Sequence, residues 1–233
     1  MKLRDLIPAV ALALAVSTFP AQAAGPSIDW DPAYGWQAGG TPNNLPLGGE
    51  FKMVGIISGF DIPFGDLNAA DPTREYTFYV SGLISGGTVP TGFPGLQFFE
   101  TNFTGGVISI YEDLSPEAAF VPNPPNAAVP SNFIDGTLLL SGSFTRFVVQ
   151  SNDFTAFQVG NIEGDINWTG GSLLARTFAT GGRPCPGLFT GGMTWRTSVG
   201  VPGYLYRHDG KIDLQCPTVT QSGTWGRIKS LYR

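Results

Sequence analysis

The chain has 233 residues, a formal net charge of −5 and only 13% charged residues, with 32 Gly and 19 Pro. The acidic balance disfavours a nucleic-acid partner, which would need a basic face. Apolar residues make up 42% of the chain and 17 residues are Phe. Disordered chains lack this much apolar and aromatic material, so the composition predicts a folded domain of short segments separated by Gly and Pro turns.

Residues 1–23 are predicted to be a cleaved secretory signal. Lys2 and Arg4 give a positive start, an apolar run covers 6–19, and Ala-Gln-Ala at 21–23 is a small-x-small cleavage site. The apolar run is about 14 residues, whereas a bilayer-spanning helix takes about 20. We therefore expect a secreted, periplasmic or cell-surface protein with no integral membrane segment after cleavage.

Residues 24–221 are predicted to form a single all-β domain, either an antiparallel sandwich or a closed barrel. Residues 75–84 show the alternation expected of a strand, with Tyr76, Phe78 and Val80 on one face. Comparable patterns predict strands at 51–60, 96–103, 107–112, 137–150, 157–168, 172–178, 193–199 and 211–214. Glycines recur inside these patterns, and such glycines often mark bends that let a sheet curl.

An aromatic-Thr-Gly-Gly sequence occurs three times, at 103–106, 168–171 and 189–192. Because Gly-Gly readily supplies positive φ, we expect each copy to be a hairpin at which one strand ends and the next begins. Residues 164–182 resemble the Gly-rich strand pair of barrels of the dirigent and allene-oxide-cyclase type. The resemblance covers under a tenth of the chain, implies no site residues, and makes a barrel as plausible as a sandwich.

Three aromatic residues near the start of this domain, Trp30, Tyr34 and Trp36, are candidate binding residues. Exposed rings beside Asp and Gln are typical of a carbohydrate-binding surface, because a ring offers an apolar face next to polar edges. A carbohydrate or another cell-surface partner would fit such a site. The alternative is an N-terminal segment that anchors itself to the core through these rings.

The loop containing Asp66, Asn68 and Asp71 is the best candidate metal site. Calcium takes six to eight oxygen ligands, and exported domains often bind it weakly. The alternative is a set of ordinary Asx turns, which the same residues favour.

Residues 115–130 hold five prolines in sixteen residues, so this stretch is not a central strand. It is predicted to be either a surface loop laid over one end of the domain or a linker. Strand-like sequence on both sides favours the loop.

Glu163, Asp165 and His208 are the candidates for an enzyme of the β-barrel type, a hydrolase or a cyclase. The two acids share one face of a predicted strand, and His208 is the single histidine. The alternatives are a solvent-facing strand for the acids and a tight His-Asp-Gly turn for His208, since Asp-Gly favours hairpins. Neither pattern assigns a catalytic residue.

Cys185 and Cys216 are the two cysteines of the chain. An even count in an exported protein predicts a disulfide, which stabilises the fold by roughly 3–4 kcal/mol in the chain-entropy model. A zinc site would need more ligands than this pair and His208 provide.

Residues 222–233 are predicted to be a basic, amphipathic tail with a short helical stripe. Its apolar residues lie at helical spacing: Trp225, Ile228, Leu231 and Tyr232. The tail is either a helical turn docked on the domain or, within 224–233, a signal that sorting machinery reads.

Three classes of function remain open. The low charge, the abundance of Gly and Thr, and the lack of a recognisable catalytic set favour a non-enzymatic binding or structural protein. The second class is the barrel enzyme. The third is an outer-membrane barrel, which would need outward apolar bands flanked by aromatic girdles.

Overall fold

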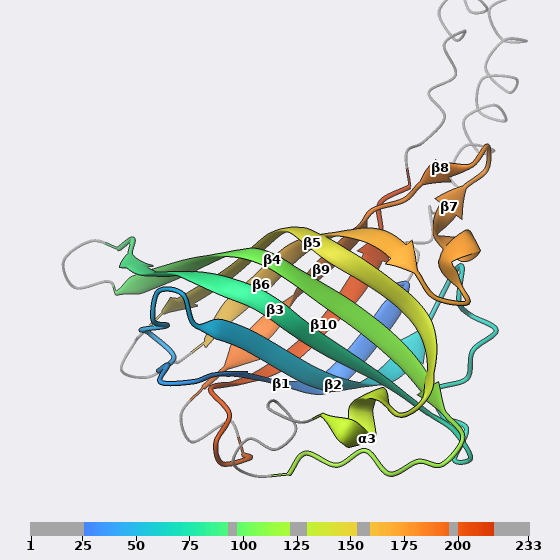
Figure 1. Cartoon of the computed structure of the whole chain (residues 1–233), viewed down its shortest axis with the longest axis horizontal. Coiled ribbons are helices and arrows are strands. Elements are labelled where there is room, and N and C mark those ends of the chain that lie inside the picture. Colours follow the sequence, from blue (N-terminus) through green and yellow to red (C-terminus); the bar gives the residue numbers. More distant parts are fainter. Residues whose placement is uncertain (1–25, 93–96, 122–129, 153–158, 196–199, 217–233) are drawn as a thin grey trace, which may run out of the picture.

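A computed structural model describes residues 26–92, 97–121, 130–152, 159–195 and 200–216. Within them, eight antiparallel strands close into one barrel (Figure 1), so the expected all-β fold is confirmed and its architecture is the barrel. The strands are β1 (Ile28–Gln37), β2 (Glu50–Phe60), β3 (Glu75–Pro90), β4 (Phe98–Asp113), β5 (Thr137–Asn152), β6 (Val159–Gly170), β9 (Gly187–Thr194) and β10 (Tyr206–Leu214). Each pairs with the next around the wall, and β10 pairs with β1, which leaves the barrel without a free edge.

A small appendage lies between β6 and β9. It consists of the 3₁₀ helix η2 (Leu174–Thr177) and a two-stranded ribbon, β7 (Phe178–Ala179) and β8 (Arg183–Pro184), which projects from one end of the barrel in Figure 1. The Cys185–Cys216 disulfide ties the base of this ribbon to the chain just after β10, with the two Cα atoms 4.3 Å apart. The predicted disulfide is therefore confirmed.

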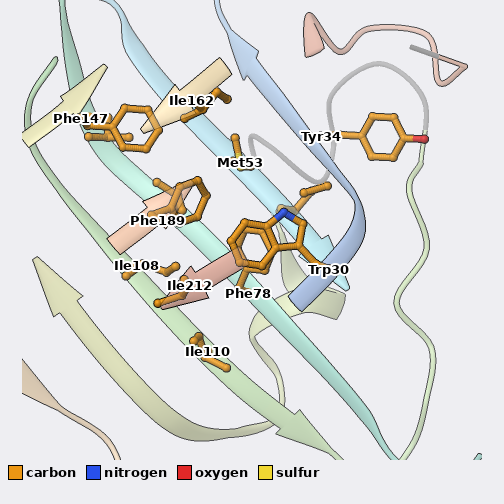
Figure 2. Packing of buried hydrophobic residues seen from close by; sticks show 14 of the residues in the cluster. Trp30, Tyr34, Met53, Phe78, Ile108, Ile110, Phe147, Ile162, Phe189 and Ile212 are labelled. Atoms are coloured by element: carbon orange, nitrogen blue, oxygen red, sulfur yellow. The ribbon is translucent and has the colours of Figure 1, made fainter. Parts of the chain in front are cut away.

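The interior of the barrel is filled with aromatic and aliphatic side chains. Trp30, Phe78 and Phe189 come from three different strands, and the Trp30 ring centroid lies 4.9 Å from that of Phe78 and 4.8 Å from that of Phe189 (Figure 2). All three are essentially buried. Burial of such rings dominates the stabilisation of a core of this kind.

Inward-facing glycines make this aromatic filling possible. A Cβ atom at Gly55 would lie 2.2 Å from the ring of Phe78, and one at Gly164 would lie 2.9 Å from Phe147. Large and small inward positions thus complement each other across neighbouring strands, as small barrels require.

The hairpin interpretation of the aromatic-Thr-Gly-Gly sequence is wrong: two of its three copies lie inside strands, and the third ends a strand without starting a hairpin. Residues 103–106 lie within β4 and residues 189–192 within β9. Positive φ at Gly105 and Gly106 bends β4 instead of ending it. The copy at 168–171 does end a strand, because β6 stops at Gly170 and Gly171 has a φ of +98°.

The Pro-rich region packs on the outside of the barrel at both of its described ends. The Phe120 ring lies 4.6 Å from Tyr34 of β1 and 5.4 Å from Phe133 of the helix α3 (Ser131–Ile134). Glu75 of β3 accepts backbone hydrogen bonds from Glu117 at 2.7 Å and from Ala118 at 2.9 Å. These contacts cover part of the outer wall of β1 and β3.

Several strand predictions differ from the structure. The strands predicted at 96–103 and 107–112 are one strand, β4, residues 174–177 of the predicted strand 172–178 form η2, and β1 is not among the predicted strands. Of the strand predicted at 193–199, only residues 193–194 lie in a strand, at the end of β9, and residues 196–199 lie outside the described residues. The predicted signal and the basic tail lie outside the described residues. Among the residues that are described, no helix is long and apolar enough to cross a membrane.

Candidate functional site

His208 lies in the middle of β10 and points into the barrel, where it is fully buried. The tight turn expected at His-Asp-Gly is wrong, because this strand pairs continuously with β9 from Arg207 to Leu214. Gly210 is a packing residue here: a Cβ atom at this position would lie 2.6 Å from the His208 ring and 3.0 Å from that of Trp30.

The imidazole of His208 is held in an aromatic environment. Trp30 Nε1 donates a hydrogen bond of 3.2 Å to Nδ1, and the ring stacks on Phe189 with an interplanar angle of 7°. Because Nδ1 accepts, a neutral imidazole carries its proton on Nε2. Among the described residues, Nε2 makes no hydrogen bond of normal geometry, although the Gly191 backbone lies beside it.

Burial governs the protonation of this histidine. Desolvation lowers the pKa of His208 from 6.5 to about 4, and the backbone of Gly191 opposes that shift only in part. The imidazole is therefore neutral at physiological pH. It contributes to the packing of the core instead of presenting a base to solvent.

Glu163 and Asp165 lie on the outer face of β6, on the other side of the wall from His208. Arg146 of β5 binds both: its Nε donates to Asp165 at 2.8 Å, and its Nη2 pairs with Glu163. The two carboxylates, Asp165 first, raise the pKa of Arg146. The structure therefore brings the two acids together as an exposed ion-pair cluster and keeps His208 apart from them.

The three candidate aromatic residues of β1 do not share an exposed surface. Trp30 is in the lumen, whereas Tyr34 lies on the opposite side of β1, as Figure 2 shows, and is only 6% exposed. The rings of Phe120 and Tyr204 pack on Tyr34, and Trp36 is half-buried against the core. These positions fit the anchoring interpretation of the segment.

The oxygen-rich loop uses its side chains within the chain itself. Asp66 forms a two-point ion pair with Arg176, which lowers the pKa of Asp66. Asn68 Oδ1 accepts from the backbone of Ala70 at 3.1 Å, and Asp71 accepts from Thr73. Across the described part of the chain, no group of three or more His, Cys, Asp and Glu residues could hold a metal ion.

Sequence reasoning missed a groove on the outer wall, near one end of β6, β9 and β10. It consists of two adjoining hollows of about 340 and 230 Å³ that share Gly160. The larger is lined by Asp31, Val159, Gly192, Thr194, Arg207 and Asp209, and the smaller by Phe98, Gln150, Asn152 and Asn161, among others. We call the two together the outer groove.

The outer groove is built from strand register. Asn161 of β6 and Asp209 of β10 both pair with Gly192 of β9, so these three residues form one outward row. Gln150 of β5 pairs with Asn161 and extends the row by one more strand. The only sequence signal for this row is the alternation of exposed polar residues, and it is interrupted where Gly192 stands.

Asp31 reaches the groove because β1 is irregular. The register of β1 with both neighbours shifts between Trp30 and Ala33, and the exposed Asp31 accepts a hydrogen bond of 2.8 Å from Arg207. Irregularities of this type commonly re-aim a side chain. Burial, and then the negative charge of Asp209, raises the pKa of nearby Asp29.

Comparison of the chain with models of protein families, with curated proteins and with solved structures finds no match in any of the three. Any functional conclusion therefore depends on the geometry described above.

Proposed function

We propose that this chain is an exported, non-enzymatic protein that acts by binding or structural contact through its outer surface. The observation that carries the proposal is the filled barrel: the inward positions hold packed aromatic and aliphatic side chains, and His208 is neutral among them. Barrels that act through their interior enclose a ligand cavity or a channel instead. Exposed polar groups of the described residues lie on the outer wall and in the loops.

The geometry argues against the barrel-enzyme alternative. A carboxylate and a general base would have to meet within hydrogen-bond reach of one substrate. Here the barrel wall separates His208 from Glu163 and Asp165, and Arg146 occupies both carboxylates.

The distribution of charge argues against the outer-membrane alternative. Arg146, Glu163 and Lys211 occupy outward positions within their strands, where a membrane barrel would need apolar side chains.

Export is part of the proposal and rests on two features. The sequence of residues 1–23 has the pattern of a cleaved signal, and the disulfide requires an oxidising compartment to form and persist. Mass spectrometry of the protein from the secreted or periplasmic fraction should give an N-terminus at Ala24. An intact Met1 in that fraction, or protein confined to the cytoplasm, would contradict export.

The non-enzymatic role is tested by a turnover assay of the whole chain on chromogenic esters, glycosides and phosphate esters. Two variants run in parallel, His208→Gln and the double variant Glu163→Gln with Asp165→Asn. We expect all three proteins to match the uncatalysed background. Turnover that either variant abolishes would overturn the proposal and identify the catalytic group.

A further inference from the structure

Gly192 forms a part of the groove floor that neither packing nor backbone conformation requires to be glycine. Its φ lies outside the left-handed region, and a Cβ atom added there would meet nothing within 4 Å. The preceding residue differs: a Cβ atom at Gly191 would lie 2.2 Å from the carbonyl oxygen of Asp209. A glycine within a strand often marks a bulge, a tight bend or a site of close approach by another molecule, and β9 pairs with both neighbours without a register shift at Gly192.

Planar polar side chains flank this open floor in register. Gln150, Asn161 and Asp209 are all exposed, and the row that they form with Gly192 crosses four strands. Adjacent strands lie 4.7–4.9 Å apart, so the row spans about 14 Å. Its side chains present amide donors, amide acceptors and a carboxylate along one line.

The next outward row adds groups of different character. Val159 and Arg207 both pair with Thr194, which supplies a hydroxyl between an apolar side chain and a guanidinium. At the far end of the groove, Phe98 is 38% exposed and lines the smaller hollow. An apolar ring face next to amides and hydroxyls suits a ligand with both C–H faces and hydroxyl edges.

The charges of the groove select against anionic ligands. Asp31 neutralises Arg207, and Glu100, at the end of the row, accepts hydrogen bonds of 2.9 Å from Gln150 and Asn102. The remaining acidic character disfavours an anionic polymer. The closed barrel also offers no strand edge on which an extended peptide could add itself as another strand.

From these observations we infer that the outer groove binds a neutral oligosaccharide, an inference that rests on the proposed binding role of the chain. A sugar hydroxyl both donates and accepts hydrogen bonds, and neighbouring hydroxyls match the two polar atoms of an amide or a carboxylate. The missing side chain at Gly192 lets a sugar ring lie against the backbone of β9 between Asn161 and Asp209.

The test is calorimetric titration of the whole chain with cellohexaose, laminarihexaose, maltohexaose, xylohexaose and chitohexaose. The blocking variant is Gly192→Leu, and the matched control is Thr190→Leu, two residues away on the outer face of β9 and outside the groove. We expect at least one sugar to bind, Gly192→Leu to weaken it by about tenfold or more, and Thr190→Leu to change it by less than about twofold.

The groove assignment is overturned if none of the five sugars binds at millimolar concentration, or if Gly192→Leu binds as tightly as the unchanged chain. If Gly192→Leu does not fold, the double variant Asn161→Ala with Asp209→Asn replaces it, because both side chains are exposed. Chromatography of the titrated mixture tests the proposed function separately. Release of shorter sugars from a bound hexasaccharide would support the groove as the binding site but would overturn the non-enzymatic role.

Discussion

The two faces of β10 differ at almost every residue. Its inward side chains, Tyr206, His208 and Ile212, are almost completely buried, whereas Arg207 and Asp209 on the outward face are exposed. Successive side chains of a strand point to opposite faces, so a single residue separates an apolar lumen from a polar wall. In this barrel a titratable group is buried in the core or exposed on the wall according to the face on which it lies.

Gly191 and Gly192 of β9 show the same contrast between the inward and the outward face, although neither has a side chain. A Cβ atom at Gly191 would strike backbone atoms of β10 and the ring of His208, whereas one at Gly192 would meet open space. Packing of the core therefore requires glycine at the inward position 191, whereas the outward Gly192 leaves open space on the surface. The predictions below set the two faces against each other.

Removing a ring from the lumen should have the largest effect. Phe189→Ala should lower the free energy of unfolding by about 3–5 kcal/mol, because Phe189 contacts five other rings, including Trp30 and His208, and its loss leaves a cavity. Thr190→Ala, the next residue on the outer face, should change it by less than about 0.5 kcal/mol. Urea unfolding measures both, and equal losses would show that the two faces do not differ.

Acid should weaken the fold through His208. Its pKa is about 4 in the folded chain and 6.5 as the reference value, so the unfolded chain takes up the proton first as the pH falls. This contribution to stability is complete above about pH 6.5 and is lost between there and pH 4. The loss amounts to about 3 kcal/mol for a shift of this size.

His208→Gln is the variant that isolates this effect. The carboxylates are the same in both proteins, so the difference between their unfolding free energies reports the histidine alone. We expect that difference to change with pH between 6.5 and 4, because only the unchanged chain loses the contribution of the neutral histidine. Parallel curves across this window would contradict a neutral, buried imidazole.

Adding a methyl group at Gly191 or at Gly192 should give a smaller difference in stability between the two faces. Gly191→Ala should destabilise the fold by about 1–3 kcal/mol, since the new Cβ would overlap backbone atoms that have little freedom to move. Gly192→Ala should stay within about 0.5 kcal/mol of the unchanged chain. Thermal unfolding of the pair is sufficient, and a neutral Gly191→Ala would mean that β9 and β10 are not packed as described.

Removing the ion pairs on the outer wall should change the free energy of unfolding least. Arg146→Met removes both contacts to Glu163 and Asp165, yet the Arg146 side chain is 45% exposed, and exposed pairs contribute about 0–1 kcal/mol. Even that difference should shrink as salt is added, because salt screens exposed charges. Urea unfolding at low and high salt checks this. A salt-independent loss of several kcal/mol would indicate that the cluster has a packing role.

The fold class could be predicted from the sequence, but the face of each glycine could not. Residues 75–84 alternate clearly because each inward position carries a large apolar side chain. In β10 the inward positions are Tyr206, His208, Gly210 and Ile212, and the middle two do not have the pattern of core residues. A polar ring followed by Asp-Gly therefore resembled a turn.

The candidate site was also beyond the reach of local patterns. Gln150, Asn161, Gly192 and Asp209 lie on four strands and become neighbours only through the pairings of β5, β6, β9 and β10. The aromatic residues of β1, which local sequence did mark, anchor the strand to the core and to its outer cover instead.

The sequence by itself determined the all-β class, many of the strand-forming segments and the disulfide, because alternation, cysteine count and turn residues are local properties. Closure of the barrel was decided only in the tertiary structure, where β10 meets β1 and Trp30 bonds to His208, 178 residues along the chain. Once the barrel is closed, each strand side chain points either into the lumen or outward from the wall. It thereby turned the single histidine into a core residue and an unremarked glycine into the floor of the outer groove.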